Sequence, residues 1–435
     1  MEKKKIFIFE FVSGGGYNTV TIPTSLFCEG YSMLRSIIED FTDLGFEVLT
    51  LLDKRIEFLA KYLRSNAIAF VDKNENYIEK YKNHLSKADN CFIIAPEFSN
   101  ILYDLTEIAI DYEKKVYSIG LEGIKQGTSK MDTYDFFKRV KLPTPETYLI
   151  PISNNQLDFD FIYEKFLELN SSLIIKPEDG VGAESIIHIN NEMKLQELQN
   201  TKKTSFKPSR NYILQRFVGG NDMSVSLIGS PNLKNNRPKI LSINTQNVVL
   251  FKNNVESQYK GGMTPAINFN QINNLLEPIL EKIDLSHFES YFGIDFIITP
   301  DNSFEFIEIN PRLTTSYLGI RNIYNTNILN FIVNPKKFEL IHALLHPNYL
   351  SEFYRLDLEY TGNQSAESLR NTYTPQILNR IPELVTPPIQ LDGEGSDNYS
   401  CFIATQARNL NSSNHRKNQI TKELKKFGFI PLDGN

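Results

Sequence analysis

Cysteine is scarce in this sequence: the 435 residues include three, Cys28, Cys91 and Cys401. Their odd number and wide separation indicate neither a disulfide framework nor a zinc site. Unpaired cysteines of this kind are typical of proteins in a reducing compartment, so their pattern predicts a cytoplasmic protein.

Long apolar runs are also missing. No segment approaches the roughly 18 uninterrupted apolar residues that a membrane-spanning helix needs. The first residues, MEKKKIFIFEFV, are similar to the start of a signal peptide, but Glu10 interrupts the apolar run and no small-residue cleavage site follows. We therefore expect a buried first strand here and no membrane partner.

The chain lacks an excess of positive charge. Its net charge is −6, unlike the basic surface of a general nucleic-acid or anionic-membrane binder. The local basic cluster HRKNQITKELKK also contains Glu423, which is typical of the solvated face of a helix. The 21 tyrosines and 30 phenylalanines are not interleaved with basic residues, so we expect no nucleic-acid partner.

Strand-like and helix-like segments alternate through the first part of the chain. The expected strands are IFIFEF, FEVLTLLD, AIAFVD, CFIIAPEF and VYSIG. Between the first two, apolar residues recur at three- and four-residue steps and form one helical face: Phe27, Tyr31, Leu34, Ile38 and Phe41. This order predicts a parallel sheet covered on both faces. Because the chain is too long for one core, further domains should follow.

Three consecutive glycines, Gly14, Gly15 and Gly16, follow the first expected strand, at the sheet edge where α/β folds bind ligands. The surrounding SGGGYN has neither the GxGxxG of a dinucleotide site nor the GK[ST] of a phosphate loop. A nicotinamide-dependent oxidoreductase is thus disfavoured. Two interpretations stay open: a loop that lets backbone approach a small substrate, or a turn with no ligand.

The segment GIDFIITPDNSFEFIEINPRLTTS predicts a hairpin with TPDNS as its turn. Asp295 lies on one strand, and Glu308 and Asn310 share a face of the other because side chains alternate. Carboxylate and amide oxygens of this kind suit Mg²⁺, and Arg312 can grip phosphate oxygens. Taken alone, the acids are also compatible with an edge hairpin whose carboxylates are solvated.

Two lysines add to this pattern. Lys176 ends a strand in SSLIIKPEDGVGAESIIHI, just before a loop around Gly180–Gly182 that could fold over nucleotide phosphates and exclude water. Lys130 opens a helix in GTSKMDTYDFFKRV. A further strand with a central glycine pair follows in NYILQRFVGGNDMSVSLIG.

In this order, Lys130, KPEDGVGAES, LQRFVGGNDMSVS and D…EIN resemble the ATP-grasp superfamily of carboxylate–amine ligases, as does the 13-residue interval between Asp295 and Glu308. The resemblance implies an ATP-grasp fold, of the α/β and α+β class, preceded by an N-terminal parallel α/β domain. It suggests an N-terminal domain over residues 1–122, a lid subdomain over 123–206 and a C-terminal subdomain with the metal-binding hairpin over 207–435.

The resemblance also implies roles for individual residues. Lys130 and Lys176 correspond to the lysines that contact ATP phosphates, and Arg312 to the arginine near the transferred phosphate. Asp295, Glu308 and Asn310 correspond to the ligands of Mg²⁺, with Mn²⁺ as an alternative ion. The adenine and ribose would be lined by Gln215, Arg216, Phe217, Val218 and Asp222. Arg216 and Asp222 depart from the family pattern, which often has glutamate at both places, so their roles are less defined.

A closer similarity is to the tyramine–glutamate ligases of methanofuran biosynthesis. It is carried by EFVSGGG, LFCEGYSMLRSIIEDF, YKGGMTP, EINPRLTTS and LVTPPIQLDGEG. It implies that a glutamate γ-carboxylate is activated as an acylphosphate and joined to a primary amine. Apart from this resemblance, a homodimer is one oligomeric state that the chain could adopt. A non-catalytic ATP- or metabolite-binding module and a small-molecule kinase stay open as alternatives. The connection from Asn371 to Asn398 is interpreted as a surface loop.

Overall fold

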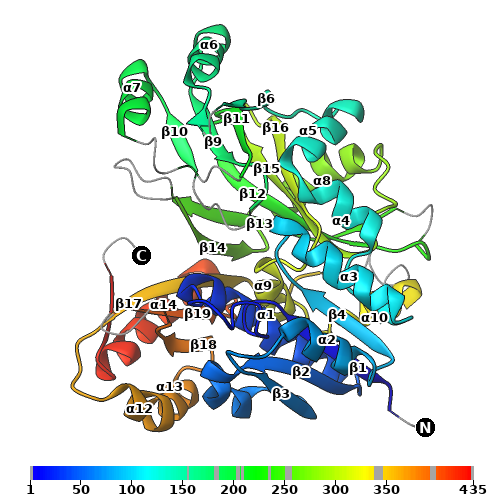
Figure 1. Ribbon diagram of the computed structural model, residues 1–435, viewed down its shortest axis with the longest axis vertical. Helices are drawn as coiled ribbons and strands as arrows, with labels where there is room; N and C mark the ends of the chain where they lie inside the picture. The colour runs from blue at the N-terminus through cyan, green and yellow to red at the C-terminus, as the bar shows by residue number, and fades with distance from the viewer. Residues whose placement is uncertain are drawn as a thin grey trace.

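The computed structural model describes residues 3–153, 156–180, 186–201, 206, 210–233, 237–249, 257–337, 346–391 and 398–432. The blue N-terminal domain and the green subdomain that carries α6 and α7 lie at opposite ends of the molecule's longest axis (Figure 1). A large antiparallel sheet lies between them and continues along the N-terminal domain. Within the described ranges, no helix is long and apolar enough to cross a membrane.

The N-terminal domain has the parallel sheet that the sequence predicts, with strand order β3-β2-β1-β4-β5. Its strands are β1 (Lys5–Glu10), β2 (Glu47–Asp53), β3 (Ala67–Val71), β4 (Asn90–Ile94) and β5 (Lys115–Val116). The connecting helices are α1 (Thr24–Asp43), η1 (Lys54–Tyr62), α2 (Tyr77–Leu85), η2 (Phe98–Asn100) and α3 (Ile101–Asp111). The central strand β1 is buried along nearly its whole length, as a strand covered on both faces should be.

The lid subdomain contains a four-stranded antiparallel sheet of order β10-β9-β11-β6, which we call the lid sheet. Its strands are β6 (Thr147–Leu149), β9 (Leu173–Pro177), β10 (Ile187–Ile189) and β11 (Tyr212–Arg216), covered by α6 (Phe159–Leu169) and α7 (Glu192–Thr201). A short hairpin, β7 (Ile152–Ser153) and β8 (Gln156–Leu157), precedes α6. Because β11 pairs with both β9 and β6, this subdomain runs to Arg216, ten residues beyond the boundary suggested at residue 206.

The large sheet has the strand order β16-β15-β12-β13-β14-β17-β19-β18, with β20 paired to β17. Its first half consists of β12 (Asn221–Gly229), β13 (Lys239–Val249), β14 (Gln258–Thr264), β15 (Ser290–Ile298) and β16 (Phe304–Asn310). The predicted hairpin is β15–β16. Helices α4 (Leu121–Thr128), α5 (Lys130–Arg139), α8 (Phe269–Leu280), α9 (Ser316–Ile323) and α10 (Leu329–Val333) accompany it. Contacts of α4 and α5 with β16 attach residues 121–139 to this sheet (Figure 1).

The second half of the sheet corrects one expectation. Residues 371–398 are not simply a surface loop: they include most of η5 (Leu369–Tyr373), all of α13 (Thr374–Arg380) and β18 (Leu384–Ile389). The prolines of LVTPPI are tolerated because β18 is the last strand in the sheet order, paired with β19 (Asn398–Ala404) alone. The remaining elements here are β17 (Ser351–Tyr360), α12 (Ala366–Ser368), α14 (Leu410–Lys426) and β20 (Phe429–Pro431).

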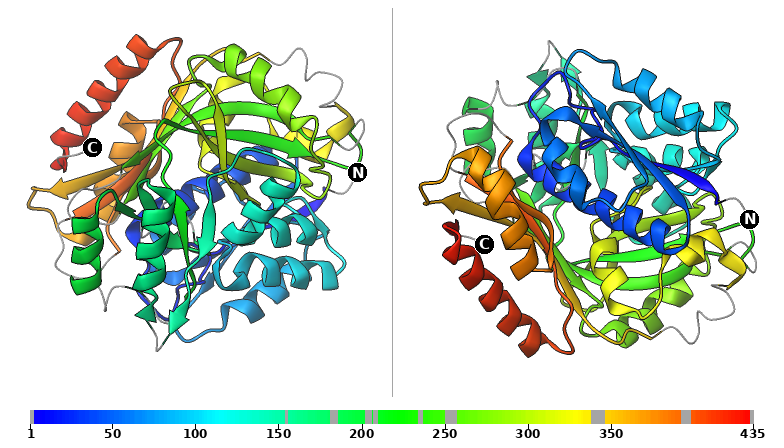
Figure 2. Two further views of the ribbon diagram at one scale, coloured as in Figure 1. Left: turned by 90° about the horizontal axis from the view of Figure 1, so that it is seen from above. Right: turned by 90° about the horizontal axis from the view of Figure 1, so that it is seen from below.

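Helix α1 joins the N-terminal domain to the second half of the large sheet (Figure 2). It packs on β1 in the domain and on β18 and β19 in the sheet. Ser32 and Thr386 share a hydrogen bond of 2.8 Å, and the Arg35 guanidinium donates to the carbonyl oxygens of Leu384 and Val385. The segment most like a surface loop in sequence is therefore part of the support for the N-terminal domain.

A buried ion pair also holds α1 against α9. The Asp40 carboxylate is 9% exposed and accepts hydrogen bonds from Tyr317 Oη at 2.6 Å and from two nitrogens of Arg321 at 2.6 and 3.1 Å. We expect Asp40→Asn to lower the free energy of unfolding by roughly 2–3 kcal/mol, because half-buried Arg321 loses the closer of its two charged partners. Urea denaturation measures this, and steady-state kinetics of the folded variant should stay normal.

The neighbouring Glu39→Gln provides the control. Glu39 contacts the same arginine through one hydrogen bond of 3.2 Å, and its side chain is 21% exposed. We expect this change to cost less than about 1 kcal/mol. Equal losses in the two variants would contradict the special role of Asp40.

Candidate active site

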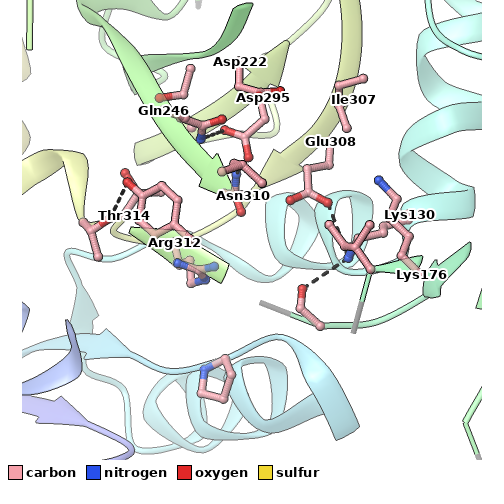
Figure 3. A pocket seen from close by; sticks show the side chains of 18 of the residues that line it. Lys130, Lys176, Asp222, Gln246, Asp295, Ile307, Glu308, Asn310, Arg312 and Thr314 are labelled. Carbon is pink, nitrogen blue, oxygen red and sulfur yellow. Dashed lines mark hydrogen bonds and ion pairs between the residues drawn. The ribbon is translucent and has the colours of Figure 1, made fainter. Parts of the chain in front are cut away.

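A cavity of about 330 Å³ opens where the N-terminal domain, the lid sheet and the large sheet meet. Its central wall is the β15–β16 hairpin. Figure 3 shows Asp295, Glu308 and Asn310 projecting from it, with Arg312 of the following segment and Lys130 and Lys176 in the same view. Residues predicted from separate motifs are thus brought to one cavity. Their roles stay predictions, whereas their proximity is a property of the fold.

Two carboxylates lie face to face on the hairpin. Asp295 and Glu308 are directly paired in the strand register. Asn310 Nδ2 donates to one oxygen of Asp295 at 3.1 Å, and Gln246 Nε2 donates to the other at 3.0 Å. Burial and the charge of Glu308 nevertheless raise the pKa of Asp295 to about 7. Placing two acids together in a buried site is unfavourable without a cation, so this arrangement suits a positively charged ligand.

The two lysines supply part of that positive charge. Lys130 begins α5, where Ser129 caps the helix, and its Nζ lies 3.4 Å from Glu308 Oε2 and 3.2 Å from the carbonyl oxygen of Gly180. Lys176, on β9, is 7% exposed, and burial lowers its pKa to about 8. Burial raises the pKa of Glu308, but Lys130 and Lys176 outweigh that effect and hold it below 4.5.

The donor set fits Mg²⁺ of the kind that is shared with a nucleotide. The described residues contain no cluster of three or more His, Cys, Asp or Glu side chains arranged for a metal. Mg²⁺ at phosphate sites usually takes one or two carboxylates and completes its shell with water and phosphate oxygens. Asp295 and Glu308, with the amide oxygen of Asn310, match that requirement, and the charge repulsion between the acids gives the site a physical need for a cation.

Arg312 is held in place by a residue that sequence patterns did not reveal. Its Nε lies 2.9 and 3.0 Å from the two carboxylate oxygens of Glu97, which follows β4 in the N-terminal domain. Burial lowers the pKa of Arg312, but the charge and hydrogen bond of Glu97 outweigh it, so the pKa is raised and the guanidinium stays charged. The N-terminal domain therefore positions a cation that belongs to the large sheet.

The predicted hinge residues line the lid side of the cavity, but two of their side chains are engaged with protein partners. Gln215 Nε2 donates to Thr147 Oγ1 at 2.9 Å, and Arg216 pairs with Glu305 at 3.0 Å. The rings of Phe217 and His188 pack together, with their centroids 4.3 Å apart. Cavity residues near them are apolar: Ile174, Ile186, Val218, Phe296 and Ile307. An apolar slot beside a short strand is suited to a flat heterocycle such as adenine. Asp222 lines the same region, and burial raises its pKa.

Of the two interpretations left open for the opening glycines, the structure favours the turn with no ligand. Gly14, Gly15 and Gly16 form a tight turn and are not among the residues that line the cavity. The N–H groups of Gly14 and Gly16 donate to the carbonyl oxygens of Glu10 and Phe11. Gly15 has φ +103°, and a Cβ there would lie 2.7 Å from Val71, so glycine is required for packing. Their neighbours Val12 and Tyr17 line the cavity instead.

The buried side chain of Glu10 stabilises this turn through hydrogen bonds. Its carboxylate accepts the N–H groups of Val12 and Ser13 at 3.0 and 2.7 Å and the Ser13 hydroxyl at 2.5 Å. Because the carboxylate and two glycine N–H groups are all committed within the turn, it offers no cradle for phosphate. Burial raises the pKa of Glu10 from 4.5 to about 7.

This shift predicts a pH dependence of stability. Between pH 4.5 and about 7 the folded protein keeps a proton on Glu10 that the unfolded chain releases, so stability should fall as pH rises. The contribution is about 3 kcal/mol across that window. Chemical denaturation across the window should show a shallower decline in Glu10→Gln, and other carboxyls cancel in the difference between the two proteins. Parallel pH profiles would contradict a raised pKa for Glu10.

Sequence motifs assigned no role to Gln246, Glu29 or Tyr259, which line the cavity, or to Glu97, which holds Arg312. Glu29 and Tyr259 lie in LFCEGYSMLRSIIEDF and YKGGMTP, two segments that carry the closer similarity, but that similarity assigned no role to either residue. Their contribution depends on pairing between distant segments, such as β12 between β13 and β15, which no local motif records.

Comparison with known proteins places this geometry in a family. The model of the ATP-grasp domain matches residues 128–316, and that of the pre ATP-grasp 3 domain matches residues 46–118. The tyramine–L-glutamate ligase of Methanocaldococcus jannaschii is 26% identical over 350 residues, which cover 77% of this chain and 94% of that one.

Two solved structures share the fold. The L-amino acid ligase of Bacillus licheniformis has a TM-score of 0.63 at 11% identity, covering 100% of both chains. The biotin carboxylase domain of the Hydrogenobacter thermophilus 2-oxoglutarate carboxylase, solved with MgADP, ADP and bicarbonate, has a TM-score of 0.66 at 11% identity, covering 100% of this chain and 92% of that one. Because the two family models fall in order on the domains that build the cavity, this chain belongs to the ATP-grasp superfamily of ATP-dependent carboxylate–amine ligases.

Proposed function

We propose that this protein joins the γ-carboxylate of glutamate to a primary amine, with tyramine as the first candidate, and that MgATP drives the reaction. The observation that carries the proposal is the cavity itself. The cations Lys130, Lys176 and Arg312 and the acids Asp295 and Glu308 line one space, which continues into the N-terminal domain. The similarity to a ligase that is named for tyramine and L-glutamate supplies the substrate class.

The chemistry requires a better leaving group than the oxide of a free carboxylate. In the proposed sequence, a glutamate carboxylate oxygen attacks the γ-phosphorus of ATP, which gives an acylphosphate and ADP. The amine then attacks the acyl carbon, and inorganic phosphate leaves. Lys130, Lys176 and Arg312 are placed to offset the negative charge that develops on the phosphoryl oxygens. Mg²⁺, or Mn²⁺, held by Asp295, Glu308 and Asn310 would supply further charge neutralisation.

Water must be kept from the acylphosphate, which it would hydrolyse. The loop predicted for this task includes Gly180, whose carbonyl oxygen contacts Lys130, whereas residues 181–185 lie outside the described ranges. The reaction needs no side-chain nucleophile. The three cysteines are buried and free, which is consistent with the proposed cytoplasmic location and with no part in the chemistry.

Incubation with ATP, glutamate and tyramine tests the proposal. We expect ADP, phosphate and an amide that mass spectrometry identifies as γ-glutamyltyramine. Replacing tyramine with hydroxylamine should trap the acylphosphate as γ-glutamyl hydroxamate. A stable phosphorylated product would favour the small-molecule kinase, and nucleotide binding without turnover would favour the non-catalytic module. Light scattering of the purified protein would test the proposed homodimer.

A further inference from the structure

We propose that Glu29 recognises the ammonium group of the amine substrate, in a pocket whose apolar walls select an amine with an apolar body. This pocket is the end of the cavity formed by the N-terminal domain. The inference rests on the proposed function and assigns its amine subsite, which is formed by Glu29, Leu26, Met33, Val12 and Phe98.

Glu29 is a carboxylate with few polar contacts to the described part of the protein. It lies on α1 with 16% of its side chain exposed, and it lines the cavity. Among the described residues, the ion-pair partner of Glu29 is Arg355, whose Nη1 lies 3.8 Å from Glu29 Oε1. The Glu29 side chain makes no hydrogen bond to any of the described residues. Burial raises its pKa. A half-buried acid with one long contact retains the capacity to bind a cation through hydrogen bonds.

Arg355 cannot satisfy Glu29 fully because another acid engages it more closely. Its Nε lies 3.0 Å from Asp357 Oδ1, and its Nη2 lies 3.4 Å from Oδ2 and 3.3 Å from Gln258. Lys260 also reaches Asp357, at 2.6 Å. In this group of two cations and two acids, Glu29 is the member that lines the cavity.

The other acid at this end is not available in the same way. Glu10 lines the cavity too, but both its oxygens accept hydrogen bonds from the Val12–Ser13 turn. Gly30 lies against it, since a Cβ at that position would be 2.6 Å from Glu10 Oε1. We therefore assign Glu10 to holding the turn and Glu29 to the ligand.

The surroundings of Glu29 determine the kind of amine. Leu26, Glu29 and Met33 recur at three- and four-residue steps, which places them on one face of α1. Val12 and Phe98 line the same end of the cavity from the loops after β1 and β4. An apolar surface next to one carboxylate fits an alkyl or arylalkyl ammonium and disfavours an amino acid, whose own carboxylate Glu29 would repel.

The end of the cavity that contains Glu29 is continuous with the end that contains Lys130, Lys176 and Glu308. Arg312 lines the same cavity, and the charges of Glu29 and Arg312 influence each other. Glu308 lies on β16, which ends at Asn310, and Arg312 follows two residues after that end. A nitrogen held near Glu29 is thus on the side of the cavity where the acyl group would be formed.

The test compares Glu29→Gln with Glu39→Gln, a glutamate on the same helix that pairs with Arg35 and Arg321 outside the cavity. We expect Glu29→Gln to raise the KM for tyramine at least about tenfold, the scale of a lost charge-assisted contact. The KM values for ATP and glutamate should stay within about twofold, and hydroxamate formation should be unchanged. Glu39→Gln should behave as wild type in all these assays.

A neutral analogue separates charge recognition from packing. Tyrosol has a hydroxyl in place of the amine of tyramine, and its inhibition constant should be the same in wild type and Glu29→Gln. Leu26→Ala, in contrast, should weaken tyrosol and tyramine alike and spare ethylamine. A KM for tyramine that does not change in folded Glu29→Gln would overturn the assignment, as would equal weakening of tyramine and tyrosol.

These outcomes are distinct from failure of the proposed function. Wild-type protein that forms no hydroxamate from glutamate and ATP would contradict the proposed function itself. Wild-type protein that forms the hydroxamate but no amide from tyramine, phenethylamine or butylamine would overturn the apolar-amine pocket alone. Thermal melting of each variant identifies any that do not fold, and Glu29→Asp, which keeps the charge, should retain more tyramine affinity than Glu29→Gln.

Discussion

Glu308→Gln is expected to leave a folded protein that has lost nearly all ATP-dependent ligation, with turnover reduced roughly 100- to 1,000-fold or more. Glutamine keeps the shape of the side chain but removes a charge that faces Asp295 and lies 3.4 Å from Lys130. Metal affinity and charge compensation during phosphoryl transfer should both fall. High Mg²⁺ should restore part of the activity if weakened metal binding is the main defect.

The structure also defines what should happen to stability. Lys130 and Lys176 hold the pKa of Glu308 below its ordinary value, so its charge stabilises the folded protein at neutral pH, and this stabilisation is lost as pH falls. Removing the charge should therefore lower the melting temperature of the metal-free protein slightly. Relief of repulsion with Asp295 alone would have raised it.

A matched control separates metal binding from a structural ion pair. Glu352, on β17, lies 2.6 Å from Lys417 and does not line the cavity. Glu352→Gln should lose stability and keep normal turnover. Glu308→Gln should in addition lose the rise in melting temperature that MgADP gives the wild type. Near-normal turnover in Glu308→Gln would refute the metal-site assignment.

Lys176→Ala is expected to weaken ATP binding about 10- to 100-fold and to reduce turnover by orders of magnitude. The lysine is buried near Glu308 and Lys130, on β9, whose residues Ile174, Lys176 and Pro177 line the cavity. A buried ammonium that has given up much of its hydration gains more from phosphate oxygens than an exposed one. Isothermal titration with ATP measures the affinity directly.

Lys176→Met keeps the volume and removes the charge, so it should fold like wild type and still lose ATP affinity. Lys417→Met removes the lysine of the pair with Glu352, away from the cavity, and should leave ATP affinity unchanged. If Lys176→Met bound ATP as well as wild type, Lys176 would be a packing residue and not a phosphate ligand.

The sequence alone determined the elements whose signals are local. The alternation of apolar strands and an amphipathic helix predicted the parallel N-terminal sheet, and the TPDNS turn predicted the β15–β16 hairpin. Period two along β16 placed Glu308 and Asn310 on one face without any knowledge of the rest of the fold. The order of these local motifs was enough to identify the superfamily.

Only the tertiary structure decided which side chains complete the site and which motifs serve packing. Gln246 reaches Asp295, and Glu97 reaches Arg312, across sequence separations of 49 and 215 residues. The glycine turn proved to be a packed support, since its N–H groups are used locally, and β18 became a strand because β19 offered a partner edge. Strand pairing, burial and the neighbours of a charge are set by segments far apart in the chain. A local pattern can therefore predict that a carboxylate lies on a strand, but not which cation it faces.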